Sequence, residues 1–175
     1  MIPAIIILIV DQLTKYLVQT NLAYGAIWSP WPWLTPYARI IHWTNTGVAF
    51  GMFQGMGWIF SIFAVAITVA IIYYFPTVAK EDWAIRVALV LEMAGALGNM
   101  IDRIRINGAV LDFISVGNFA VFNVADSAIT TGVLSLLIFQ RQFFKTQHES
   151  PVEKNTAMTE DVSSDLADNN LKADE

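Results

Sequence analysis

The chain has 175 residues, of which 55% are hydrophobic and only 14% are charged. Soluble domains carry about 25% charged residues, so this composition excludes an ordinary soluble protein and favours a membrane protein. The net charge of −5 arises in residues 149–175, which hold eight acidic and two basic side chains, and no basic patch indicates a nucleic-acid partner.

The first apolar segment runs from Ile2 to about Leu22 and contains Asp11 and Lys15. A secretory signal peptide is the rival interpretation of this segment. No basic residue precedes the apolar run and a lysine lies inside it, which argues against that rival. We therefore expect a first membrane span here.

The connection after this span predicts turns and then strands. Residues 29–36 contain three prolines, which is typical of a turn-rich loop. Arg39 to Phe53 alternates in polarity, is rich in β-forming residues and is interrupted by glycines. We expect this stretch to form a short strand pair at the membrane surface.

Three further apolar segments follow, at residues 56–75, 83–101 and 119–139. A helix of twenty residues is about 30 Å long, which matches the hydrocarbon core of a bilayer. The first of the three has no charge, whereas Glu92 lies within the second and Asp126 is the only charge of the third. They predict spans two, three and four.

Basic residues predict the orientation of the four spans. Residues 76–86 and 140–148 carry four lysines and arginines, whereas the longer segments 19–55 and 102–118 carry three. By the positive-inside rule both termini are cytoplasmic. We expect an all-α membrane protein with four transmembrane helices and a small extracytoplasmic β cradle between helices 1 and 2.

Composition divides the chain into two parts. Residues 1–147 form the predicted four-helix membrane domain. Residues 148–175 are polar and acidic, and they predict a disordered cytoplasmic tail to which we assign no role.

Alternation of the spans brings many polar residues to the outer side of the membrane. Ionisable groups at membrane depth are costly and usually mark function. The group comprises Asp11, Lys15, Asn45, Asn99, Asp102, Arg103, Asp112, Asn123 and Asp126.

Some of these residues also have a purely structural interpretation. Asp11 and Lys15 are spaced i, i+4 and could form an ion pair on one helix. Asp102 lies next to Arg103, and the two could form an ion pair at a helix end.

A structural role accounts for some of the remaining acidic residues more readily than for others. Asn123 and Asp126 have the spacing of a cap at a helix start, where both side chains could bind free backbone N–H groups. Asp112 is flanked by apolar residues and has no basic residue within four positions, so its pKa should be raised. Glu92 could be functional or could bond a neighbouring helix, and it stays unassigned.

Two carboxyl groups close together share one proton, because both cannot ionise cheaply. The ionised carboxylate can take a proton from water while the neutral acid donates to the scissile carbonyl and then to the leaving amine. Asp112 and Asp126 are the best candidates for such a pair. The chain lacks a zinc-protease motif, a serine-hydrolase motif and any cysteine, and with two histidines it predicts no metal centre.

Five short motifs then show a resemblance to a known family, the lipoprotein signal peptidases (signal peptidase II). They are Asp11-Gln-Leu-Thr-Lys15, Asn45-Thr-Gly-Val-Ala-Phe50, Gly95 to Arg103, Val110-Leu-Asp112-Phe113 and Phe122-Asn123-Val-Ala125-Asp126. Each motif alone is weak, but five in order over residues 1–140 are specific. The chain resembles the family throughout the predicted membrane domain.

The resemblance implies an aspartic endopeptidase of the bacterial cytoplasmic (inner) membrane, with its active site near the extracytoplasmic face. Such enzymes remove the signal peptide of a prolipoprotein by cutting just before the cysteine that carries a diacylglyceryl group. It also implies membrane lipids as partners, inhibition by globomycin and no cofactor.

The family's site residues can be carried over position by position. The catalytic pair falls on Asp112 and Asp126. The supporting positions, which would hold the pocket and contact the substrate, fall on Asp11, Lys15, Asn45, Asn99, Asp102, Arg103 and Asn123. One departure is that only ten residues, none charged, precede Asp11, so either the first span is short or the natural start lies upstream.

Two alternatives belong to other classes of protein. A small proton- or ion-coupled transporter could use the intramembrane acids as a relay, but the acids gather at one side instead of crossing the membrane. A membrane scaffold would use them only for pairing and capping.

Overall fold

The computed structural model describes residues 2–47 and 52–139. Within these ranges the chain is mostly helical, with α1 (Ile2–Asn21), α2 (Gly57–Tyr74), α3 (Trp83–Arg105) and a further helix, Val124–Phe139. A three-stranded sheet consists of β1 (Ile27–Trp28), β2 (Ala38–Asn45) and β3 (Val110–Val116). Residues 1–136 form one compact unit.

Among the described residues, the helices that begin at Ile2, Gly57 and Trp83 are long and apolar enough to cross a membrane. The helix Val124–Phe139 is apolar but shorter. The first three predicted spans thus coincide with helices, and α2 ends where Pro76 lies within a 3-10 turn, Phe75–Thr77. Several apolar helices with a small sheet are consistent with a membrane protein.

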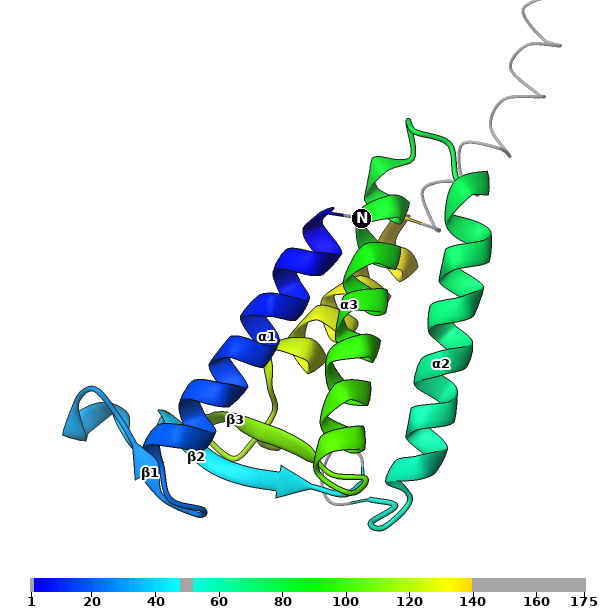
Figure 1. The fold of residues 1–175 in the computed structure, drawn as a ribbon. Helices are drawn as coiled ribbons and strands as arrows, with labels where there is room; N and C mark the ends of the chain where they lie inside the picture. The colour runs from blue at the N-terminus through cyan, green and yellow to red at the C-terminus, as the bar shows by residue number, and fades with distance from the viewer. Residues whose placement is uncertain (1, 48–51, 140–175) are drawn as a thin grey trace, which may run out of the picture. The chain divides into compact units, whose positions relative to one another are not determined.

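The central helix is α3, which lies between α1 and α2 in Figure 1. Eleven of its residues are buried, against four in α1 and four in α2. Small residues line its buried face, because Ala88 and Ala94 are fully or almost fully covered. Close approach of neighbouring helices in a membrane depends on such residues.

Glycine makes one of these approaches possible at the start of α2. A Cβ atom on Gly57 would clash with the carbonyl oxygen of Gly108, which follows α3. The backbones of the two segments are therefore in direct contact, and Gly57 has no room for a side chain.

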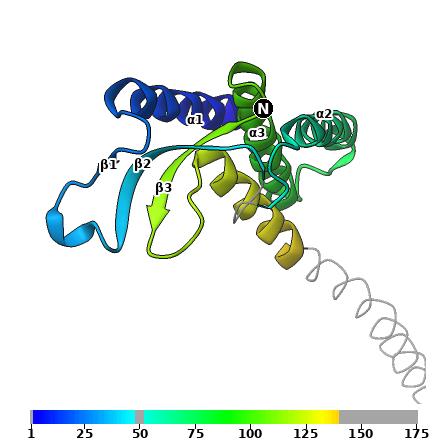
Figure 2. The same ribbon diagram turned by 90° about the horizontal axis from the view of Figure 1, so that it is seen from below.

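The sheet lies across one end of the helices, where β2 and β3 run side by side in Figure 2. Its order is β1-β2-β3, and both pairs are antiparallel. The register pairs Trp43 with Asp112 and Asn45 with Val110, with an irregularity between Ile40 and Trp43. The sheet thus brings Asn45 of the first long connection close to Asp112 of the second.

This pairing corrects the prediction of a strand pair within Arg39 to Phe53. β2 lies in that range, but its partners are β1 and β3. The alternating pattern correctly predicted a strand, but the sequence does not specify which other strands that strand pairs with. The predicted cradle between helices 1 and 2 likewise has a third strand, β3, from the connection after α3.

The prediction that the fourth apolar segment is helical from Phe119 was also wrong at its start. The helix begins at Val124, because Phe122 pairs with β3. The backbone N–H of Phe122 donates to Ile114 at 3.0 Å, and its carbonyl accepts from Ile114 at 2.7 Å. Those bonds hold the backbone extended until the helix cap. The predicted tail 148–175 and residues 48–51 lie outside the described residues.

Substitution of Ala88 by leucine should destabilise the protein. The Ala88 side chain is fully buried, and overpacking of a filled core costs about 1–3 kcal/mol. Ala66→Leu is the matched control, because Ala66 is exposed on α2. Thermal unfolding in detergent should show a lower midpoint for Ala88→Leu only; equal midpoints would mean that α3 is not packed as described.

Candidate active site

Asp112 lies in the middle of β3, and its side chain is buried at 3% exposure. Two amide groups donate to its carboxyl group. Asn45 Nδ2 is 3.2 Å from Asp112 Oδ2, and Asn123 Nδ2 is 2.8 Å from Asp112 Oδ1. The carboxyl is therefore held in one orientation by donors from two different connections.

Asp126 lies in the first turn of the helix Val124–Phe139. The N–H of Asn123 donates to Asp126 Oδ2 at 3.2 Å, and the N–H of Asp126 donates to Asn123 Oδ1 at 2.9 Å. This reciprocal arrangement is a capping box, so the predicted cap is confirmed. The other carboxyl oxygen, Oδ1, accepts from Asn99 Nδ2 at 2.7 Å, a bond that a helix cap does not require.

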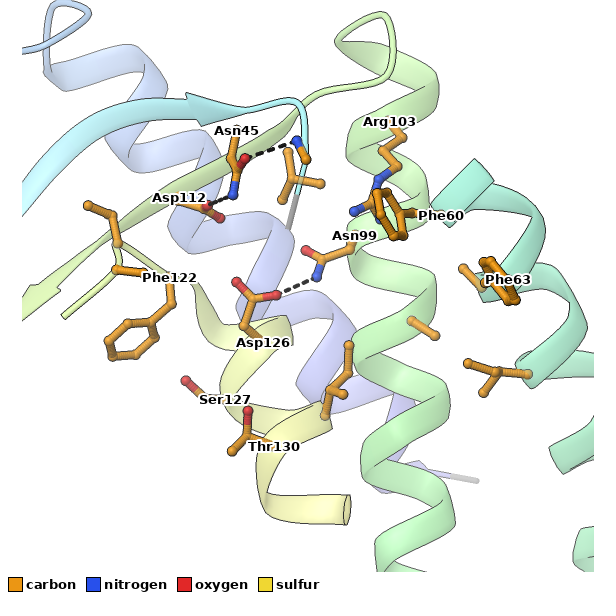
Figure 3. A pocket seen from close by; sticks show the side chains of 18 of the residues that line it. Asn45, Phe60, Phe63, Asn99, Arg103, Asp112, Phe122, Asp126, Ser127 and Thr130 are labelled. Carbon is orange, nitrogen blue, oxygen red and sulfur yellow. Dashed lines mark hydrogen bonds between the residues drawn. The ribbon is translucent and has the colours of Figure 1, made fainter. Parts of the chain in front are cut away.

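Asn123 connects the two carboxyl groups. It is fully buried, and its Nδ2 also donates to Asn99 Oδ1 at 3.1 Å. Its oxygen is engaged by the N–H of Asp126, so the amide nitrogen must face Asp112. Figure 3 shows the carboxyl groups of Asp112 and Asp126 pointing into the same space, with Asn99 beside them.

Burial raises the pKa of the Asp112 carboxyl from 3.8 to about 7, and the negative charge of Asp126 contributes to this rise. The hydrogen bonds from Asn45 and Asn123 and the positive charge of Lys15 act in the opposite direction without cancelling it. Asp112 therefore titrates near neutral pH.

A buried ion cluster lies beneath the two aspartates. Lys15 Nζ is 2.9 Å from Asp11 Oδ2 and 2.9 Å from Asp102 Oδ2. All three side chains are almost fully buried. Gln12 Nε2 donates to both carboxylates, at 3.1 Å and 3.3 Å. A buried ion pair persists only where further hydrogen bonds satisfy its charges, as they do here.

The same cluster holds the backbone beside each candidate catalytic residue. Asp102 Oδ2 accepts from the N–H of Leu111 at 3.0 Å, and Leu111 precedes Asp112. Asp11 Oδ1 accepts from the N–H of Ala125 at 2.9 Å, and Ala125 precedes Asp126. Each carboxylate of the cluster thus anchors one of the two segments that carry the acid pair.

Lys15 also reaches the acid pair through Asn99. Its Nζ donates to Asn99 Oδ1 at 3.2 Å, which leaves the Asn99 amide nitrogen for Asp126. Gly98 must be glycine for this packing, because a Cβ atom there would lie 2.7 Å from Asp11 Oδ2.

Arg103 lies on α3 at the edge of the site. Its guanidinium group is 5.5 Å from the centre of the Phe60 ring on α2. Its Nε is buried and has no hydrogen-bond partner among the described residues. The predicted alternative, an ion pair of Asp102 with Arg103, was wrong: Asp102 binds Lys15 instead.

A cavity of about 590 Å³ opens at the acid pair. Its polar wall comprises Asn45, Asn99, Arg103, Asp112, Asp126, Ser127, Thr130 and Thr131. Its apolar wall includes Phe60, Phe63, Ala64 and Ile67 of α2 together with Phe119 and Phe122. The site can therefore hold a molecule with one polar and one greasy part next to two carboxyl groups.

The structure brings all nine predicted site residues into one connected region. Asp112, Asp126, Asn45, Asn99 and Arg103 line the cavity. The others lie behind it and hold its walls, as the bonds of Asn123, Asp11, Lys15 and Asp102 show.

Sequence reasoning missed two residues that bond to this region, Gln12 and Gln54. Gln12 lies within the first motif, and its spacing from Lys15 (i, i+3) could have placed it on the same helix face. Gln54 donates to Asn45 Oδ1 at 3.3 Å across a loop, and no spacing rule indicates that contact.

The chain is similar in sequence to a known protein family. Residues 3–142 match the family model described as Signal peptidase (SPase) II. A lipoprotein signal peptidase of Shouchella clausii is 42% identical over 75% of this chain and 85% of its own length. One of Staphylococcus aureus is 37% identical over 77% and 83%.

A solved structure described as a bacterial membrane enzyme has the same arrangement. It superposes with a TM-score of 0.76 at 34% identity, over 85% of this chain and 91% of that chain. A second structure with the same description gives a TM-score of 0.68 at 35% identity.

Removal of the charge on Lys15 should destabilise the fold strongly. Lys15→Met leaves two buried carboxylates without a cation, and such a loss costs about 3–5 kcal/mol. The triple variant with Asp11→Asn and Asp102→Asn removes those charges but keeps an oxygen for each backbone N–H. Its unfolding midpoint should lie above that of Lys15→Met; a midpoint at or below it would contradict the charge argument.

Stability should depend on pH through Asp112. Between pH 3.8 and about 7 the folded chain keeps the Asp112 proton that the unfolded chain loses. Folding thus binds a proton, and this contribution to stability falls as pH rises, by at most about 1.4 kcal/mol per pH unit. Relative to Asp112→Asn, the wild type should therefore lose stability between pH 4.5 and 7.5. A constant difference between the two unfolding free energies would refute the raised pKa.

Proposed function

The chain belongs to the signal peptidase II family, whose members are proteases named lipoprotein signal peptidases, and we propose that it cleaves prolipoproteins by activating water at the pair Asp112 and Asp126. Membership of the family supports removal of a signal peptide from a prolipoprotein. The acid pair, the bond that is cut and the face of the membrane are parts of the proposal.

One observation carries the proposed mechanism: two carboxyl groups point into one cavity and share the donor Asn123. Asp112 and Asp126 both line the cavity. Asp112 comes from β3 and Asp126 from the helix Val124–Phe139, and Asn123 donates to Asp112 through its side chain and to Asp126 through its backbone N–H. A scaffold that used its acids only for pairing and capping would not need both carboxyls to line an open cavity.

The first chemical step is attack of water on the scissile carbonyl carbon. The ionised carboxylate accepts a proton from the water, while the protonated carboxyl donates to the carbonyl oxygen as negative charge develops there. The product is a tetrahedral intermediate. The protonated carboxyl, which has so far donated only a hydrogen bond, then gives its proton to the amide nitrogen. The oxyanion becomes a carbonyl again as the C–N bond breaks, a carboxylic acid and an amine leave, and the former base holds the proton taken from water, so the pair still carries one proton.

We assign the base to Asp126 and the acid to Asp112. Asp126 lies in the first turn of a helix, where the helix dipole and the N–H of Asn123 stabilise a carboxylate. Asp112 has a pKa raised to about 7, so it keeps its proton below neutral pH. Because the two groups are coupled, the pair works while it holds one proton between them.

The cavity suits a lipid-modified peptide. Its apolar wall on α2, with Phe60, Phe63 and Ile67, would leave acyl chains in contact with lipid. Asn45 and Arg103 line the polar wall, where they would contact the substrate backbone. We propose that the bond cut lies just before the diacylglyceryl-modified cysteine.

The setting of the enzyme follows from the same proposal. Several apolar helices and bacterial relatives support a multi-pass membrane protein. We propose that it lies in the cytoplasmic (inner) membrane among its lipids, with both termini cytoplasmic and the acid pair near the extracytoplasmic face. Globomycin would occupy the cavity and block cleavage.

Substitution of either member of the pair should abolish cleavage. Asp112→Asn and Asp126→Asn retain shape and acceptor oxygens but cannot exchange the proton, and general acid–base catalysis is worth about 10²- to 10⁴-fold. The measurement is release of the signal peptide from a diacylglyceryl-modified precursor by the purified protein, with and without globomycin.

The control is Asp82→Asn, the same change at the start of α3. It should cleave at the wild-type rate. Unfolding midpoints accompany each assay, so that a misfolded variant is recognised. Wild-type cleavage by Asp112→Asn or by Asp126→Asn would remove that residue from the mechanism.

A further inference from the structure

The amide of Asn45 can face Asp112 in two ways, and only one of them supplies a donor. An asparagine side chain has an oxygen that accepts and a nitrogen that donates. In the structure, Nδ2 faces Asp112 Oδ2 at 3.2 Å. If the amide turned over, its oxygen would face a carboxyl oxygen, and the donor to Asp112 would be lost.

Two donors hold the amide in its productive orientation. The backbone N–H of Gly47 donates to Asn45 Oδ1 at 3.0 Å, and Gln54 Nε2 donates to the same oxygen at 3.3 Å. Both require an oxygen on the side away from Asp112. The Gly47 bond is local to β2, whereas the Gln54 bond comes from beyond the loop and joins the start of the α2 segment to the acid pair.

Gln54 is itself held in one orientation by Thr46. The Thr46 hydroxyl is hydrogen-bonded to Gln54 Oε1, and its oxygen accepts from the N–H of Gly55 at 3.3 Å. Donation therefore runs in one direction, from Gly55 through Thr46, Gln54 and Asn45 to Asp112. Each member fixes which end of the next one can donate, and such chains strengthen their members.

The loop backbone is shaped to place Gln54 over the end of β2. Phe53 has a φ of 56° and Gly55 a φ of 80°, so left-handed residues flank Gln54 on both sides. An aromatic residue rarely adopts this conformation, and such outliers cluster at functional sites. A Cβ atom on Gly47 would clash with the Met52 carbonyl, which shows how closely the two sides of the loop approach.

We propose that Gln54 is a positioning residue for the acid pair: it holds the Asn45 amide with its nitrogen toward Asp112. The inference rests on the proposed function for its catalytic consequence, but not for its geometry. Within residues 2–47 and 52–139, Gln54 is not part of the cavity wall and reaches Asp112 through Asn45.

Loss of the Gln54 side chain should change the pKa of Asp112 in one direction, upward. The hydrogen bond from Asn45 lowers the Asp112 pKa against the larger effect of burial. Without the Gln54 donor the Asn45 amide keeps its bond from Gly47 but is held less firmly, so that this lowering of the Asp112 pKa weakens. The Asp112 pKa then rises, and the alkaline limb of the kcat profile moves to higher pH.

Two Gln54 variants separate the loss of its hydrogen-bond donor from the effect of an added charge. Gln54→Leu removes both polar atoms, and Gln54→Glu keeps the oxygen that binds Thr46 but replaces the amide nitrogen and adds a charge. Gln19→Glu, at an exposed position on α1, controls for an added charge. Each purified full-length protein is assayed for cleavage of a diacylglyceryl-modified precursor from pH 5 to 9.

We expect kcat to fall about three- to tenfold in both Gln54 variants, as for one lost hydrogen bond, while KM stays within about twofold. The alkaline limb should shift upward in Gln54→Leu and stay in place in Gln19→Glu. A wild-type kcat in Gln54→Leu would overturn the inference. So would a lower kcat with an unmoved pH profile, since that is the result of mere structural damage.

A second readout needs no catalysis and separates this inference from the proposed function. The infrared band of the protonated Asp112 carboxyl, obtained as the difference from Asp112→Asn, gives its titration midpoint directly. The midpoint should rise in Gln54→Leu. An unchanged midpoint overturns the inference even in an active enzyme, whereas a raised midpoint in a protein that cleaves no precursor upholds it and rejects the proposed function.

Discussion

A single buried lysine is the constraint on which the rest of the site depends. Lys15 is enclosed between Asp11 and Asp102, and desolvation of these three charges is costly unless every polar atom is used. The two carboxylates also accept from the backbone: Asp102 Oδ2, which binds Lys15, accepts from the N–H of Leu111 just before Asp112, and Asp11 Oδ1 accepts from the N–H of Ala125 just before Asp126. The cost of burying charge is therefore offset by bonds that fix both segments of the acid pair relative to α1 and α3.

This arrangement gives Asp126 two roles at once. Its backbone and side chain complete the cap of a helix, while its other oxygen faces the cavity and binds Asn99. Structural and functional interpretations of the same residue are thus compatible. Because the Asp126 side chain is short and is bonded to the backbone of the cap, its carboxyl has little freedom to move. Rigid elements of a fold hold reacting groups in place in this way.

The elements were largely predictable from the sequence because hydrophobic runs and turn residues are local signals. The first three apolar segments coincide with α1, α2 and α3, and the spacing of Asn123 and Asp126 correctly indicates a cap. Strand pairing was not predictable, since alternation in β2 does not reveal that its partner β3 lies about 70 residues further along the chain.

The site residues were accessible to sequence reasoning mainly through the family's motifs. Adjacency in the sequence suggested Arg103 as the partner of Asp102, whereas Asp102 binds Lys15 on another helix. Gln54 could not have been found, because it lies beyond the motif Asn45 to Phe50 and its contact with Asn45 depends on left-handed residues on either side of it. Long-range polar contacts depend on packing, which composition and spacing do not encode.

The backbone contact between Gly57 and Gly108 has a consequence for the evolution of such an enzyme. It sets the spacing of α2 from the end of α3, and Arg103, which lines the cavity, also lines a smaller hollow beside these glycines. A lineage that acquired a methyl group at Gly57 would have to displace α2, whose residues Phe60 and Phe63 line the cavity, and the width of the cavity would change with that displacement. The missing side chain of Gly57 thus sets how closely α2 approaches the end of α3 beside the cavity.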